Sequence, residues 1–292
     1  MHPTLASLLS SGPVVTDGAW GTQLQALGLE AGLRPDSWNF THPDRVREVA
    51  ARYVRAGSRV ILTNTFRSNR IAFTSPEGSI DIAALNAAGV ALSREAAGGQ
   101  AKVFASIGPS GKMLMSGDVT ERDLEAAFSE QARALAAAGA DGLVVETMSD
   151  LFEALIALKA AKGTGIPVVV SMVFDSGKEK DRTMMGATPE KVAETLTGAG
   201  ADVIGANCGL GIEGYIPVCE RLKKATALPI WIKPNAGLPK MEGSAIRYDV
   251  SPEFFASHYV ALRDAGAAFV GGCCGSTPDF IRALVSARCA SN

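Results

Sequence analysis

The chain has 292 residues, of which 47% are hydrophobic and 20% are charged, and its formal net charge is -2. This length is ample for a large buried core, and the near-balanced charge gives no electrostatic reason to expect a nucleic-acid or membrane partner. No apolar run approaches the roughly 18 residues that a membrane-spanning helix needs. The first residues, "MHPTLASLLSSGPVV", lack the basic segment and long apolar core of a signal peptide. We therefore expect a cytoplasmic protein.

Eight short runs rich in β-branched residues alternate with longer, alanine-rich stretches. Each run is apolar along its length, which is typical of a parallel strand that is covered on both faces. The predicted strands are "VVTDG" (14–18), "RVILTNTF" (59–66), "KVFASIGP" (102–109), "DGLVVET" (141–147), "PVVVSMVF" (167–174), "DVIGANCG" (202–209), "PIWIKPNAG" (229–237) and "AAFVGGCCG" (267–275).

Helical patterns lie between these runs, for example over residues 42–57, 120–139 and 149–163. The predicted N-caps are Thr120, Ser149, Thr188, Ser251 and Thr277. Eight such βα units, of roughly 36 residues each, exceed the five or six strands of a usual doubly wound sheet. The pattern predicts a single (β/α)8 TIM barrel that forms one domain over residues 1–292. The longest polar insertion, residues 175–187, follows the fifth strand.

Unusual polar residues recur where the predicted strands end. In a barrel of this kind the active site forms from the C-terminal strand ends and the loops after them. The residues at these points are Asp17, Gly18, Asn64, Thr65, Glu146, Asn207, Cys208, Asn235, Cys273 and Cys274. Core packing explains such side chains poorly, so we interpret them together as a site.

The five cysteines are an odd number in a long chain, which argues against a secreted disulfide framework. Cys208 alone would more often be a small buried hydrophobe than a ligand. Cys273 and Cys274 are adjacent, and successive side chains of a strand point to opposite faces. Both sulfurs reach one cavity only if the backbone leaves strand geometry, and we expect the neighbouring glycines to permit this: Gly271, Gly272 and Gly275.

Three converging thiolates predict a Zn²⁺ site whose fourth position is open, with Cys208, Cys273 and Cys274 as ligands. A closed four-cysteine site would need Cys219 or Cys289, and both fall in helical stretches away from the strand ends. An open site of this kind suits a substrate thiol, because the metal removes its proton. The surplus negative charge on the sulfurs favours nucleophilic attack on a methyl group.

The motifs resemble those of the zinc-dependent homocysteine S-methyltransferases, a family that includes betaine– and S-methylmethionine–homocysteine methyltransferases and the homocysteine-binding module of methionine synthase. The resemblance covers essentially the whole chain. It runs through "TDGAWGTQLQ" (16–25), "ILTNTF" (61–66), "SIGPSG" (106–111), "VVETMSD" (144–150), "GANCG" (205–209), "KPNAG" (233–237) and "GGCCGSTP" (271–278).

The resemblance implies that the chain activates homocysteine as a zinc-bound thiolate and methylates it to methionine. It also implies that Asp17, Glu146 and Asn235, with backbone around Gly18 and Ala19, seat the amino acid part of homocysteine. A carboxylate such as Glu146 would pair with the ammonium group. The other interpretation of Glu146 is a strand-end acid that caps the following helix.

The methyl donor is expected to be a small onium compound, such as S-methylmethionine or a betaine-like molecule, or a methyl-corrinoid on a separate protein. We expect no room in this chain for folate or cobalamin modules. Trp20 is a candidate donor-side residue, because an aromatic face attracts a sulfonium or quaternary ammonium; it would otherwise be a wall of the pocket. Lys233 either offsets the negative metal site or extends outward to solvent.

Two other classes of function remain open from the residues. The glycine-rich end of the eighth strand could be the phosphate cradle of a barrel aldolase or isomerase, although the cysteines would then be unexplained. A barrel that has lost catalysis could instead act as a zinc or thiol sensor.

Overall fold

The computed structural model describes residues 1–30, 32–73, 80–242 and 245–291 of the chain. Eight parallel strands form one ring in the order β1-β10-β7-β6-β5-β4-β3-β2. An isolated parallel bridge between Thr16 and Val60 joins the last strand to the first. The strands are β1 (Val14–Val15), β2 (Val60–Ile61), β3 (Lys102–Ile107), β4 (Gly142–Met148), β5 (Val168–Met172), β6 (Val203–Gly211), β7 (Ile230–Asn235) and β10 (Ala267–Val270). The predicted TIM barrel is confirmed.

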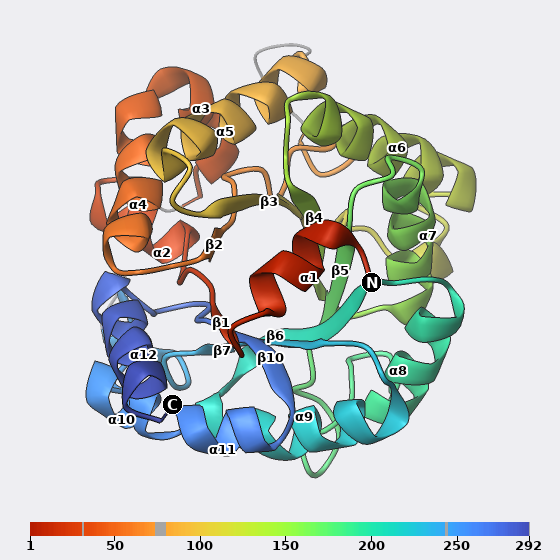
Figure 1. The fold of residues 1–292 in the computed structure, drawn as a ribbon. Helices are drawn as coiled ribbons and strands as arrows, with labels where there is room; N and C mark the ends of the chain where they lie inside the picture. The colour runs from red at the N-terminus through yellow and green to blue at the C-terminus, as the bar shows by residue number, and fades with distance from the viewer. Residues whose placement is uncertain (31, 74–79, 243–244, 292) are drawn as a thin grey trace.

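Helices surround this ring of strands (Figure 1). The outer helices are α4 (Pro43–Arg55), α5 (Ile82–Ala97), α6 (Glu121–Ala137), α7 (Leu151–Lys162), α8 (Pro189–Gly198), α9 (Ile212–Ala225), α10 (Pro252–Ser257), α11 (Tyr259–Asp264) and α12 (Pro278–Ala290). Shorter pieces are α1 (Pro3–Leu9), α2 (Gly21–Ala26), η1 (Pro35–Ser37), α3 (Trp38–Thr41) and η2 (Leu114–Ser116). Among the described residues every helix is too short or insufficiently apolar to cross a membrane.

The apolar strands divide their side chains between two cores. Along β4, Val144 packs inside the barrel, whereas Leu143 and Val145 pack outward under the helices. On β5, Val169 points inward and Val170 outward in the same way. Since side chains alternate along a strand, both faces need apolar residues, and this is why the runs are continuous.

Helix α1 closes the end of the barrel where the strands begin. It crosses the centre of the ring in Figure 1, and the side chains of Leu5 and Leu8 join the inner core with Val60, Phe104 and Trp231. Because α1 lies at the strand starts, the polar strand ends face the opposite side of the molecule.

Most of the predicted helix starts are confirmed. Thr120 and Asp123 form a reciprocal capping box at α6. Side chains also cap the helices after Thr188, Ser251 and Thr277. The predicted cap at Ser149 is wrong, because the carboxylate of Asp150 accepts the hydrogen bond from the backbone N–H of Phe152 (2.8 Å) and caps α7.

Two features of the C-terminal loops were not predicted. The loop after β7 contains an antiparallel hairpin, β8 (Lys240–Glu242) and β9 (Ala245–Arg247). The helical layer before β10 is divided into α10 and α11 at His258. Both features lie between β7 and β10, the strands that carry Asn235 and lead to the cysteine pair.

Candidate metal centre

Three cysteines meet at the C-terminal end of the barrel. The Sγ atoms of Cys208, Cys273 and Cys274 all lie within 4.8 Å of one another, and those of Cys208 and Cys274 are 3.9 Å apart. Tetrahedral zinc with Zn–S bonds of about 2.3 Å requires sulfurs about 3.8 Å apart. The three donors therefore fit Zn²⁺ in spacing as well as in softness.

The other two cysteines lie away from this centre. The thiol of Cys219 on α9 is buried and hydrogen-bonds to the carbonyl oxygen of Ala265 (3.6 Å), and burial raises its pKa to about 12. Cys289 is exposed on α12. In the part of the chain that the structure describes, the cluster holds three cysteines and no fourth, so the open site is favoured over the closed one.

The backbone that brings the sulfurs together differs from the one predicted. Gly275 has φ +80°, as expected, but Gly271 and Gly272 lie outside the left-handed region. A Cβ atom on Gly271 would overlap the side chain of Thr16. The close contact between these two residues therefore requires glycine at position 271. Instead, the left-handed backbone occurs at Cys208 itself, with φ 63°, and at Gly209, with φ 61°. The metal centre thus holds one ligand in a strained conformation.

Backbone hydrogen bonds fix the cysteine pair against the end of β7. The N–H of Cys273 donates to the carbonyl oxygen of Pro234 (2.6 Å), and the N–H of Ala236 donates to that of Cys274 (2.9 Å). The hydroxyl of Tyr215 donates to the carbonyl oxygen of Cys208 (2.7 Å). All three ligand residues are therefore anchored through their main chain.

The three thiols share charge unequally. Hydrogen bonds from the thiols of Cys273 and Cys274 lower the pKa of Cys208. The same contacts with Cys208 raise the pKa of Cys273 and of Cys274. The trio alone therefore stabilises one thiolate, and binding of Zn²⁺ requires release of the remaining protons.

Tyr248 is a neighbour of the centre that sequence reasoning missed. Its hydroxyl lowers the pKa of Cys274, and its ring packs so closely on Gly275 that a Cβ there would overlap it. Burial is the main reason that the pKa of Tyr248 is raised. It follows the β8–β9 hairpin, and no periodic pattern in that segment points to it.

Glu146 lies at the end of β4 and is 8% exposed. Its carboxylate accepts a hydrogen bond from the hydroxyl of Ser106. Burial raises the pKa of Glu146, and the nearby Lys233 ammonium opposes this shift. The helix-cap interpretation is wrong, because Asp150 caps α7.

Asp17 and Lys233 form a buried ion pair beneath the site. Lys233 is 2% exposed, so the expectation that it extends to solvent is wrong. The other carboxylate oxygen of Asp17 accepts from the backbone N–H of Leu62 (2.7 Å) and from the indole N–H of Trp20 (2.8 Å). Asp17 thereby fixes one edge of the half-buried Trp20 ring.

Most of the remaining predicted residues form hydrogen bonds with other protein groups, whereas one has a polar atom without a partner. The side-chain amide of Asn64 donates to Pro35 and Asn39, and the hydroxyl of Thr65 donates to the carbonyl oxygen of Ser106 (2.7 Å). The N–H of Ala19 donates to Ser276, and the buried amide of Asn207 bonds to neighbouring strands. By contrast, the buried Oδ1 of Asn235 has no hydrogen-bond partner. Gly18 is buried against Tyr53 and Ser276.

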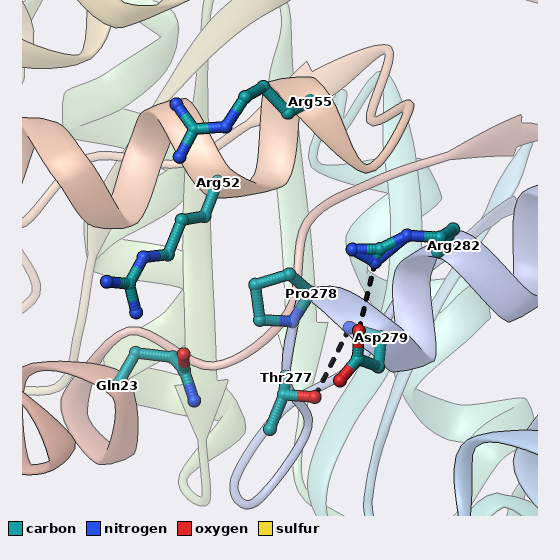
Figure 2. Close-up of a pocket in the computed structure, with 7 residues that line it drawn as sticks. All are labelled: Gln23, Arg52, Arg55, Thr277, Pro278, Asp279 and Arg282. Atoms are coloured by element: carbon teal, nitrogen blue, oxygen red, sulfur yellow. Dashed lines mark hydrogen bonds and ion pairs between the residues drawn. The ribbon is translucent and has the colours of Figure 1, made fainter.

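A separate pocket of about 380 Å³ opens on the outer wall between α2, α4 and α12 (Figure 2). It is lined by Gln23, Arg52, Arg55, Thr277, Pro278, Asp279 and Arg282. Arg52 and Arg55 pair with Glu48, and Arg282 pairs with Asp279. Carboxylates thus offset most of its positive charge, and with no cysteine in its lining it is not the thiol site.

A TIM barrel with an open three-cysteine metal centre at its C-terminal face defines a class of thiol-handling metalloenzymes. The sequence model described as "Homocysteine S-methyltransferase" matches residues 14–288. The chain belongs to the homocysteine S-methyltransferase family.

Relatives and solved structures agree with this assignment. The chain is 31% identical to methionine synthase of Mycobacterium leprae over 98% of its own length, and 30% identical to that of Mycobacterium tuberculosis over 97%. It spans about a quarter (25%) of the length of both relatives. The metallated form of the homocysteine methyltransferase MmuM from Escherichia coli has the same fold, with a TM-score of 0.80 and 24% identity over 97% of this chain and 99% of that one.

Proposed function

We propose that this chain transfers a methyl group to the thiol of homocysteine and produces methionine. The observation that carries the proposal is the set of three sulfurs within 4.8 Å of one another at the open end of the barrel. Three protein ligands leave a tetrahedral metal one position for a substrate atom, and a thiolate matches the softness of the site. The family assignment supports the same reaction.

When bound, Zn²⁺ would keep the substrate sulfur deprotonated at neutral pH. The thiol proton passes to solvent, and the sulfur then attacks the methyl carbon in line. The new S–CH3 bond forms as the bond to the donor breaks, and the donor leaves with that electron pair. The residues of this chain hold the sulfur and the amino acid group in place for this displacement.

For the amino acid group we propose contacts with Glu146 and Asn235, together with Asp17, Asn64, Thr65 and the backbone of Gly18 and Ala19. Asn207 was expected among these contacts, but protein groups fill the hydrogen-bonding positions of its amide. Glu146 and Asn235 are the best supported, since Glu146 brings a carboxylate to the strand end and the Oδ1 atom of Asn235 is buried without a partner. A substrate ammonium would satisfy both. The buried cation of Lys233 offsets the negative charge around them.

For the methyl donor we propose a small onium compound or a methyl-corrinoid carried by another protein, with Trp20 on the donor side. The hydrogen bond from Trp20 to Asp17 fixes the ring and supports a role as a binding face. We further propose that residues 1–292 form one domain, and that the protein works in the cytoplasm, where the three thiols would stay reduced.

The decisive experiment combines metal analysis with a methylation assay on the wild type, Cys208→Ser and Cys289→Ser. The donors to be screened are S-methylmethionine, betaine, S-adenosylmethionine, methylcobalamin and a methyl-corrinoid protein. We expect one zinc per chain and methionine formation in the wild type and in Cys289→Ser, which alters an exposed thiol outside the site. Cys208→Ser should lose both.

Each opposite result has a definite meaning. An active wild type without metal would overturn the role of zinc. A chain that binds zinc but methylates homocysteine with none of these donors would favour a sensor over an enzyme.

A further inference from the structure

We propose that Asn207 is a positioning residue that couples the carboxylate end of the site, at Glu146, to the cysteine centre. This inference rests on the proposed function for its catalytic consequence, although the coupling itself is a property of the folded chain. The resemblance that assigns ligands and substrate contacts gives Asn207 no such role.

The amide of Asn207 is fully buried, and its hydrogen-bonding capacity is filled by protein groups. Its Oδ1 atom accepts from the backbone N–H of Thr147 (2.9 Å) and from the hydroxyl of Ser171 (2.6 Å). Its Nδ2 atom donates to the hydroxyl of Thr147 (2.7 Å) and points at the sulfur of Cys273 (3.9 Å). Two acceptor and two donor positions are all that an amide has, so none is left for a substrate.

The orientation of this amide follows from its partners. The backbone N–H of Thr147 can only donate, so the atom that faces it must be the oxygen. The nitrogen is then directed at Cys273. A hydrogen bond from a neutral donor to a metal-bound sulfur limits the charge on that sulfur and fixes its direction.

Asn207 joins two irregular points of the barrel. The pairing of β4 with β5 shifts register between Val145 and Met148, around Glu146 and Thr147. The pairing of β6 with β7 shifts between Asn207 and Gly211, around Cys208. Each irregularity contains a non-glycine residue in the left-handed region, Thr147 at φ 60° and Cys208 at φ 63°.

Such conformations persist only where surrounding contacts hold them, and they cluster at active sites. The side chain of Asn207 reaches from β6 across Ser171 of β5 to Thr147 of β4, and it binds both the N–H and the hydroxyl of that residue. One amide therefore sets the position of the Glu146 carboxylate relative to the sulfurs. The two ends of homocysteine would be bound at a separation that Asn207 determines.

The first test reads the sulfur geometry without a methylation assay. Asn207→Asp keeps an acceptor for Thr147 and Ser171 but loses the N–H toward Cys273. The matched control is Asn86→Asp, a fully buried amide far along the chain that donates to the carbonyl oxygens of Ser68 and Ile82. Each full-length variant is loaded with Co²⁺, whose sulfur charge-transfer bands report the ligand geometry, and its zinc affinity is measured by chelator competition.

We expect Asn207→Asp to shift the Co²⁺ bands and to weaken zinc binding by about 10- to 100-fold, the usual range for loss of a partner of a metal ligand. Asn86→Asp should leave both as in the wild type, even if it lowers the melting temperature. Bands and affinity that are unchanged in Asn207→Asp would overturn the proposal.

The second test separates positioning from substrate contact. With an active donor, Asn207→Asp should lower kcat roughly tenfold or more, because misplaced anchors affect the reacting geometry. A rise in KM for homocysteine at unchanged kcat would mean that Asn207 contacts the substrate, and the proposal would be wrong.

A milder variant covers the case in which Asn207→Asp does not fold. Ser171→Ala removes one hydrogen bond to Asn207 and introduces no charge. It should shift the Co²⁺ bands in the same direction by a smaller amount, and unshifted bands would count against the coupling. If the wild type binds metal but methylates nothing, the proposed function fails, while the spectra still decide the role of Asn207.

Discussion

The carboxylate of Glu146 is buried at the C-terminal end of the barrel, and this burial shifts the pH at which it becomes charged. Burial raises its pKa, whereas Lys233 and the hydroxyl of Ser106 lower it. A raised pKa means that the folded protein favours the protonated acid, so ionised Glu146 destabilises the fold as pH rises through that pKa. A buried carboxylate that destabilises the fold when it is ionised is typical of a functional site, where its charge is used.

Glu146→Gln should raise KM for homocysteine by roughly 10- to 100-fold, the range expected for loss of a charge-assisted hydrogen bond. In the wild type, KM should rise as the pH falls toward the raised pKa of Glu146, because the protonated acid no longer attracts the substrate ammonium. Initial-rate measurements from pH 5 to 8, a range chosen to lie above the usual glutamate pKa of about 4.3, test both points.

Ser106→Ala is the informative companion variant. It removes a hydrogen bond that lowers the pKa of Glu146, so the increase in KM should begin at a higher pH than in the wild type. If Glu146→Gln keeps the wild-type dependence of KM on pH, the ammonium partner is a different residue.

At the residue scale, sequence reasoning identified the groups that carry distinctive chemistry. The cysteine trio and Glu146 were predicted as site residues because they end predicted strands, and strand ends of a barrel converge. The three sulfurs do meet, and the substrate role of Glu146 stays a prediction. Thr147, Ser171 and Tyr248 were missed. Their roles depend on a register shift or on a hydrogen bond across strands, and neither leaves a mark in the order of residues.

Among the structural elements, the turn after β10 is tightly constrained at Gly275. Gly275 combines φ +80° with the ring of Tyr248 where a Cβ would be. Gly198, at the end of α8, is exposed and lies outside the left-handed region, and a Cβ at this position would point into open space. The two glycines therefore form a matched pair for substitution.

Gly275→Ala should destabilise the protein by about 1–3 kcal/mol and weaken zinc binding, because the new methyl group displaces Tyr248 from Cys274. Gly198→Ala should be neutral or should stabilise by up to about 1 kcal/mol, since alanine favours a helix. Urea unfolding and zinc competition measure both effects. A Gly275→Ala protein with wild-type stability would refute the account of this turn.

At the element scale, the sequence predicted the alternation of strands and helices well and the irregular pieces poorly. Continuous apolar runs fixed the strands, and polar capping residues located most helix starts. The β8–β9 hairpin was missed because no core imposes a period there: Lys240, Met241 and Arg247 are exposed. The two-residue β1 and β2 are shorter than the strands predicted over residues 14–18 and 59–66.

For the molecule as a whole, α1 is the element that completes the inner core. Leu5 is fully buried against the inward-facing strand residues. Leu5→Ala should reduce the free energy of unfolding by about 2–5 kcal/mol, the usual cost of such a cavity. Ser7→Ala, on the exposed side of the same helix, is the control and should change it by less than about 0.5 kcal/mol. Equal losses from both, measured by denaturant unfolding, would show that α1 is not part of the barrel core.

The closing of the strand starts by α1 has a kinetic consequence. In the proposed reaction, homocysteine and the methyl donor would both enter through the loops at the other end of the barrel. A donor that reaches the bound sulfur from that end would cover it, so homocysteine would enter first and methionine would leave last. Turnover should therefore follow an ordered sequence, in which excess donor traps methionine in the barrel and slows its release.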